Sequence, residues 1–76
     1  MTEKEFLHKM MLVKRTGLIN MYDKQCVSKI LNAWGFCKYS DKVRLMSYKE
    51  YTNLLHEMSK YEQQYVKENE VNGKEN

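Results

Sequence analysis

The longest helical pattern of the chain lies at residues 47–68, SYKEYTNLLHEMSKYEQQYVKE. Ser47 and Glu50 have the spacing of a capping box, in which each side chain accepts a hydrogen bond from the other residue's backbone amide. The apolar residues that follow recur every three or four positions, as on one face of a helix. Such a helix is roughly 30 Å long, more than a domain of 76 residues can cover. We therefore expect its last turns to be solvated or to pack against a second copy of the chain.

Upstream, the sequence predicts two further helices at about residues 2–16 and 23–34. Thr2 opens the first of them with a second capping-box pattern. Gly17 and Gly35 follow the two segments and can adopt the left-handed backbone conformation that commonly ends a helix. The apolar residues in both segments are spaced by threes and fours, so each helix should bury one face.

Residues 36–46 allow two structures. Either Ser40 caps a short helix that runs to Met46, or the segment forms a β-hairpin that turns at residues 40–42. That turn contains neither Gly nor Asn, the residues that tight hairpin turns favour. We prefer the short helix and keep the hairpin as the alternative.

The fold class predicted from these patterns is all-α: a compact three-helix domain with one additional short helix and a long C-terminal helix. A single domain spans residues 1–68, and a flexible polar tail follows at 69–76. The chain contains no proline, which permits uninterrupted helices. Because so small a domain buries only about 60% of the surface of its unfolded chain, we expect it to gain further burial as a homodimer.

The net charge of +3 is unevenly distributed along the chain. The first 49 positions hold ten of the 13 Lys and Arg residues and four of the 10 Asp and Glu residues, a balance of +6 against −3 for the rest. This asymmetry suggests an anionic partner or head-to-tail pairing of two copies, with an uneven solvated surface as the alternative. The basic residues we choose as candidate contacts are Lys38, Lys42 and Arg44.

Tyrosine and methionine are abundant, with six of each. Both are enriched at the centres of protein interfaces, although ordinary core packing explains them as well. Because the long helix outruns the domain, we favour an interface on it. The candidate interface residues are Tyr48, Tyr51, Leu55, Met58, Tyr61 and Tyr65.

The predicted helices and short turns also resemble a helix-turn-helix motif in outline. The second helix would then supply polar side chains for contacts to base edges, namely Lys24, Gln25, Ser28 and Asn32. The turn into this helix is longer and more apolar than that motif usually has. A small DNA-binding regulator or packaging accessory protein is therefore the alternative function rather than the first.

No pattern in the chain indicates catalysis or a metal site. Cys26, Cys37, His8 and His56 lack the closely spaced ligand pairs of zinc sites, and we expect both cysteines to be reduced thiols. No nucleophile, base and acid are placed at a catalytic spacing. The sequence thus predicts no enzyme, no cofactor and no metal. Trp34, the single tryptophan, closes the apolar face of the second helix and is expected to be a core anchor.

The expected location is the cytoplasm. No apolar run approaches the roughly 20 residues of a membrane span, and residues 1–5 lead into no apolar core of a secretion signal. We therefore expect no contact with a membrane.

The run GLINMYD at residues 17–23, followed by Val27 and by Gly35 with Phe36, resembles a small family of phage- and prophage-encoded proteins of unknown function. In that family a Gly-x-x-Asn-Met-aromatic-Asp run precedes a helix that ends in Gly and an aromatic residue. The resemblance covers residues 8–58, while the insert at 42–47 and the Glu-rich tail depart from it. It implies a phage origin and a compact helical fold, and brings no catalytic residues. From its residue types alone, the run is a hinge between two helices.

These observations predict a small phage-encoded protein that binds and occludes a host macromolecule. An inhibitor of a bacterial defence system, of the anti-CRISPR type, is its most concrete form. The expected partner is a host protein or nucleoprotein complex in the bacterial cytoplasm, with nucleic acid as a further candidate. Mimicry of DNA is disfavoured by the positive net charge.

Overall fold

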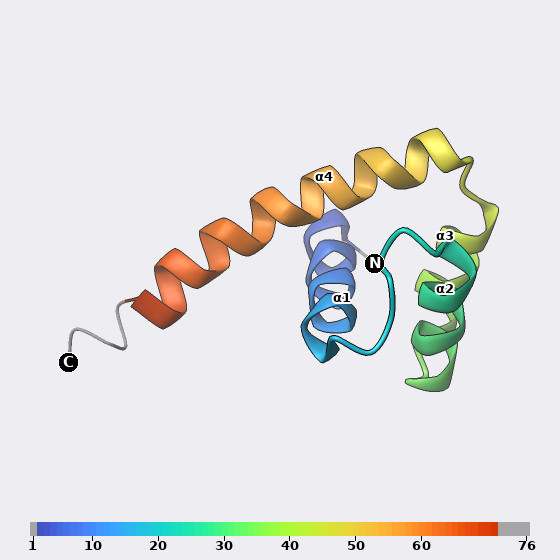
Figure 1. Ribbon diagram of the computed structural model, residues 1–76, viewed down its shortest axis with the longest axis horizontal. Helices are drawn as coiled ribbons and strands as arrows, with labels where there is room; N and C mark the ends of the chain where they lie inside the picture. The colour runs from blue at the N-terminus through green and yellow to red at the C-terminus, as the bar shows by residue number, and fades with distance from the viewer. Residues whose placement is uncertain (1, 72–76) are drawn as a thin grey trace.

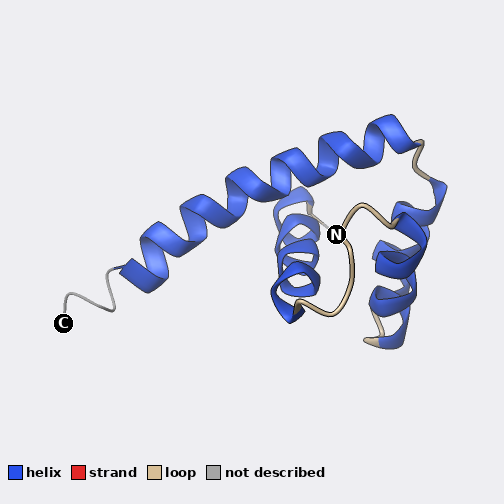
Figure 2. Cartoon of the chain, in the orientation of Figure 1, coloured by secondary structure: helices blue, strands red, loops and turns tan. Residues whose placement is uncertain are grey.

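The computed structural model describes residues 2–71, and the structural statements that follow concern this part of the chain. Figure 2 shows helices joined by loops, with no strand in the described range. The elements in order are α1 (Glu3–Thr16), α2 (Lys24–Ala33), α3 (Cys37–Leu45), α4 (Tyr48–Tyr65) and the π-helical segment η1 (Val66–Val71). The predicted all-α fold with a long C-terminal helix is confirmed, and the alternative β-hairpin at residues 36–46 is wrong.

Helix α4 runs along one side of the molecule, and α1 packs against its middle (Figure 1). Helices α2 and α3 lie against each other near the start of α4. The last turn of α4 and the segment η1 extend beyond α1, and the principal dimensions are 42 × 24 × 24 Å. The side chains of Lys67, Glu68 and Asn69 are exposed, as expected for a helix longer than its domain.

The predicted helix ends are confirmed by their hydrogen bonds. At the start of α1 the Thr2 hydroxyl accepts from the Glu5 amide at 3.1 Å, which is one of the two bonds of the predicted capping box; the Glu5 carboxylate accepts from the Tyr39 hydroxyl instead. At its end, Gly17 has the left-handed φ of 67° and donates to the Lys14 carbonyl at 3.1 Å. Ser47, at the start of α4, takes part in both bonds of the capping box. Local sequence therefore determines where these two helices begin and where α1 ends.

A single core connects the four helices. Helix α4 contributes Tyr51, which is fully buried and whose hydroxyl donates to the Met21 carbonyl in the loop at residues 17–23. This bond holds the apolar loop against the core. The buried hydrophobic side chains of the described residues are Phe6, Met10, Met11, Val13, Val27, Leu31, Val43, Tyr51, Leu55 and Met58.

Helices α2 and α3 form an antiparallel hairpin that turns at Gly35, whose φ is 85°. Ser28 and Ser40 meet across its centre, with their Oγ atoms 2.8 Å apart. Further along, Lys24 at the start of α2 donates from Nζ to the Arg44 carbonyl at the end of α3, at 3.3 Å. Residue numbers fall on one helix as they rise on the other, which is the register of antiparallel neighbours. The small serine side chains allow the two helices to approach closely.

Two predictions about this hairpin are wrong. Helix α3 begins at Cys37, with Phe36 as its N-cap, so Ser40 lies inside the helix and does not cap it. The left-handed turn at Gly35 reverses the chain at once and leaves no room for a longer loop. Trp34 is not a core anchor, because α2 ends one residue earlier and 40% of the Trp34 side chain is exposed.

The predicted tail at residues 69–76 is corrected in its first part. Residues 69–71 belong to η1 and continue the helical path of α4. The Asn69 side chain donates to the Tyr65 carbonyl at 2.9 Å, one turn earlier. Residues 72–76 lie outside the described part of the chain.

We expect the stability of the protein to fall in acid as the capping box of α4 is lost. The Ser47 amide donates to the Glu50 carboxylate at 2.9 Å, and hydrogen bonds with Ser47 lower the pKa of Glu50 from its ordinary value of 4.5. Since the folded state has the lower pKa, this stabilisation is complete above about pH 4.5 and disappears as the pH falls through the folded-state pKa.

Urea unfolding of the wild type and of Glu50→Gln between about pH 3 and pH 7 measures this contribution. The glutamine keeps a hydrogen-bond acceptor at the cap but does not titrate. The variant should therefore lose less stability than the wild type on acidification. Equal losses in the two proteins would show that the Glu50 carboxylate has the same pKa in the folded and unfolded states.

Candidate functional site

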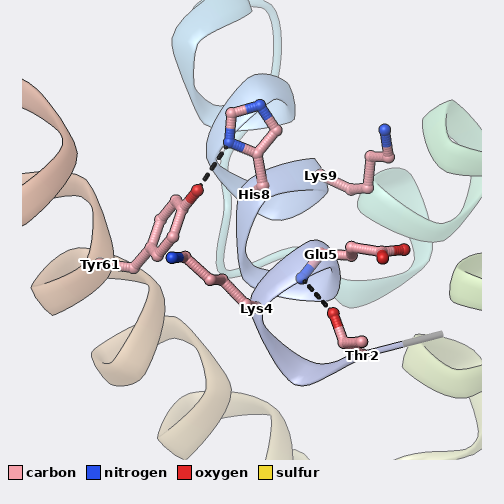
Figure 3. A pocket seen from close by; sticks show the side chains of 6 residues that line it. All are labelled: Thr2, Lys4, Glu5, His8, Lys9 and Tyr61. Carbon is pink, nitrogen blue, oxygen red and sulfur yellow. Dashed lines mark hydrogen bonds between the residues drawn. The ribbon is translucent and has the colours of Figure 1, made fainter. Parts of the chain in front are cut away.

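An open groove of about 350 Å³ runs between α1 and α4 (Figure 3). Lys4 and His8, one helical turn apart, lie on the side of α1 that faces α4, and Tyr61 of α4 lies opposite them. Glu5 and Lys9, also one turn apart, lie on the other side of α1. The full lining is Thr2, Lys4, Glu5, His8, Lys9 and Tyr61.

Aromatic rings from both helices pack at the α4 side of this groove. The His8 Nδ1 and the Tyr61 hydroxyl are hydrogen-bonded at 2.9 Å, and their rings meet edge to face with centroids 5.9 Å apart. Tyr65 stacks on Tyr61 with centroids 6.3 Å apart, and the Arg15 guanidinium lies 5.7 Å from the Tyr65 centroid. Arg15 also donates from Nε to Glu62 at 3.2 Å. These contacts hold the second half of α4 against α1.

A row of aromatic rings continues from the other side of the groove. The rings of Trp34 and Phe36 meet edge to face with centroids 6.3 Å apart, and those of Phe36 and Tyr39 do so at 6.1 Å. Tyr39 in turn lies 5.4 Å from the buried ring of Phe6. Its hydroxyl donates to Glu5 at 3.1 Å. Burial, and then this bond, raise the pKa of Tyr39, which keeps its phenol protonated.

Two lysines lie on these rings. The Lys9 Nζ is 4.5 Å from the centroid of Phe36, and the Lys42 Nζ is 5.3 Å from the centroid of Phe6. Both distances fit cation–π contacts. We call the continuous surface formed by the groove and the aromatic row the basic–aromatic face. It comprises Lys4, His8, Lys9, Trp34, Phe36, Tyr39, Lys42, Tyr61 and Tyr65, with Glu5 between its two halves.

The structure places the predicted interface residues in two different environments. Tyr51, Leu55 and Met58 are 0%, 7% and 2% exposed and belong to the core, so their assignment to an exposed interface is wrong for the folded chain. The reason is that α1 packs against the middle of α4, while the loop at residues 17–23 lies against Tyr51 through the Met21 carbonyl. Tyr61 and Tyr65 are half-buried at the groove. Tyr48 is 56% exposed, and its hydroxyl donates to the Tyr22 carbonyl at 3.5 Å.

The predicted basic contacts do not form one group. Lys38 and Lys42 are exposed and lie one turn apart on α3, on the side that bears the basic–aromatic face. Arg44 is paired with Asp41 at 3.0 Å. It lines a separate polar groove between α2 and α3, which includes Lys29. The basic–aromatic face and this polar groove therefore lie on different sides of α3.

The side chains predicted to contact base edges are largely engaged within the hairpin. Ser28 is buried against α3, and the Asn32 Oδ1 accepts from the Cys37 thiol at 3.2 Å. Lys24 donates to carbonyls at the end of α3. These contacts leave fewer polar side chains of α2 free to reach base edges.

The cysteines are free thiols and lie in separate polar contacts. The Cys26 thiol donates to the Asp23 carboxylate at 3.2 Å, and this bond raises the pKa of Cys26. A raised thiol pKa reduces the thiolate that acts as nucleophile or metal ligand. Within residues 2–71, no three side chains of His, Cys, Asp or Glu are grouped as they would be to bind a metal ion. His56 is exposed on α4, whereas His8 lines the groove.

No helix within the described range is both long enough and apolar enough to pass through a bilayer.

The residues of the face that the sequence did not predict are Lys9, Phe36 and Tyr39. The exposed position of Trp34 was also not predicted. The run WGFCKY at residues 34–39 contained a signal for the three aromatic residues, since three rings so close to a glycine rarely face one core together; the sequence contained no such signal for Lys9. Comparisons with protein-family models, with curated proteins and with solved structures found no match for this chain.

Proposed function

We propose that this chain is a non-catalytic binding protein that occludes an acidic surface of a host macromolecule. A phage-encoded inhibitor of a bacterial defence system, acting in the host cytoplasm, is the class of protein that fits this activity. The phage origin is supported by the resemblance carried by residues 17–23, with Gly35 and Phe36. Self-association as a homodimer stays a prediction. The exposed side chains of Tyr22, Leu45 and Tyr48 are the candidates for its contact surface.

The observation that carries this proposal is the basic–aromatic face. Its lysines outnumber its one carboxylate, Glu5, whose charge is partly engaged by Tyr39. Aromatic side chains with a cationic neighbour are typical of the residues that dominate binding energy at interfaces. An open groove of this kind suits a macromolecular partner better than a small substrate, which enzymes usually enclose. The arrangement of the thiols and histidines gives no activated nucleophile.

Affinity capture from a bacterial host lysate, with and without nuclease treatment, tests the proposal. We expect the wild type to retain a partner that Trp34→Ala and Lys9→Glu each lose. Lys29→Glu makes the same charge change on α2, outside the face, and should retain the partner. Circular dichroism confirms that all variants fold. Retention by Trp34→Ala and Lys9→Glu at the level of Lys29→Glu would refute the assignment of this face.

A further inference from the structure

We infer that the basic–aromatic face binds single-stranded nucleic acid, with phosphates at Lys9 and Lys42 and an unstacked base on Trp34. This inference rests on the proposed function, because it names the ligand of the same face. The ligand is recognised by its chemistry: a polyanion whose charges alternate with flat, exposed rings.

The lysines of the face are available to an anion. Neither Lys9 nor Lys42 forms an ion pair with a carboxylate in the described part of the chain, and each is held over an aromatic ring instead. Lys38 lies one turn from Lys42 on the same side of α3 and is exposed. By contrast, the cations Lys14 and Arg15 are occupied by Glu62. Lys9, Lys38 and Lys42 therefore place unneutralised positive charge beside the aromatic row.

The aromatic row supplies what a single strand needs in addition to charge. Proteins that bind single strands combine a cationic groove with aromatic side chains on which bases stack. Trp34 is 40% exposed and stands at the end of the row, where an incoming base can reach its indole. Phe36 meets it edge to face, and Tyr39 packs edge to face against Phe36 in turn.

A duplex fits this surface less well. The bases of a duplex stack on one another, and a protein reads their edges with a helix placed in a groove. Of the polar side chains of α2 that would do so, Ser28 and Asn32 are already engaged with α3. An acidic protein would match the lysines, but it lacks the regular alternation of charge and flat ring that a single strand offers along its whole length.

The test uses Trp34 as its own reporter, since it is the only tryptophan in the chain. Titration of the wild type with an oligothymidylate of about 20 nucleotides should quench tryptophan emission at low salt. Anisotropy of a labelled oligothymidylate then compares variants. Trp34→Ala should weaken binding by about 5- to 100-fold. Lys42→Gln should reduce the steepness of the plot of log K against the logarithm of the salt concentration by about 0.7. Lys29→Gln should leave both the affinity and this slope unchanged.

Duplex DNA of the same length and a poly-glutamate chain are the competing ligands. Absence of quenching by the oligothymidylate, or equal binding of poly-glutamate or of the duplex, would overturn the inference. The wild-type quenching needs no variant, so the test stands even if Trp34→Ala does not fold. The two proposals can also fail separately. If the wild type captures a nuclease-resistant partner that Trp34→Ala loses, but does not bind the oligothymidylate, the proposed function is supported and only the nucleic-acid ligand is rejected.

Discussion

Tyr51→Ala should lower the free energy of unfolding by about 3–5 kcal/mol. Tyr51 is fully buried in the core, and its hydroxyl donates to the Met21 carbonyl, so the truncation removes a buried ring and a bond that anchors the loop at residues 17–23. A domain of 76 residues has a total stability of about 4–11 kcal/mol. The truncation should therefore remove a large share of this stability, and it unfolds the protein if the wild type lies at the low end of the range.

Urea or thermal unfolding followed by circular dichroism measures this loss. Tyr48→Ala is the matched control, because it removes the same side chain from the same helix at a position that is 56% exposed, and it should cost less than about 1 kcal/mol. Tyr51→Phe isolates the hydroxyl and should cost about 1 kcal/mol. A folded Tyr51→Ala protein that retains its stability but loses a partner would restore Tyr51 to the interface.

The comparison of Tyr51 with Tyr48 shows what helical periodicity can and cannot predict. Spacing by threes and fours correctly placed Tyr51, Leu55 and Met58 on one face of a long helix. It could not identify what covers that face, because a helix presents the same pattern to its own core and to a partner. Here the chain's own core covers it, with α1 against the middle of α4 and the loop at residues 17–23 against Tyr51.

Local hydrogen-bonding signals were more informative than apolar spacing at the helix ends. Ser47 with Glu50, and Gly17, each have one dominant local role, and the structure uses each in that role. Trp34 and Ser40 have no such single role. Their environment depends on the left-handed turn at Gly35. Because of this turn, α3 begins at Cys37 rather than at Ser40, and the side chain of Trp34 is exposed. The candidate site was missed for the same reason, since its rings come together only through this turn.

Ser40→Leu should lower the free energy of unfolding by about 2–4 kcal/mol. Ser40 is 5% exposed and donates to the Ser28 carbonyl at 2.7 Å, so the substitution removes this bond and forces a larger side chain between two closely packed helices. Ser40→Ala removes the bond without adding volume and should cost about 1 kcal/mol. The difference between the two variants therefore measures how tightly α2 and α3 are packed.

Chemical denaturation of both variants, with Lys38→Leu as the control, decides the outcome. Lys38→Leu introduces the same side chain on the same helix at an exposed position, where it should change stability by less than about 0.5 kcal/mol. If Ser40→Leu costs no more than Ser40→Ala, the serines do not meet across a close antiparallel contact. The polar side chains of α2, such as Gln25 and Asn32, would then again be candidates for contacts to base edges. A large difference instead fixes α2 against α3 and leaves the nucleic-acid contacts to Lys9, Lys42 and Trp34.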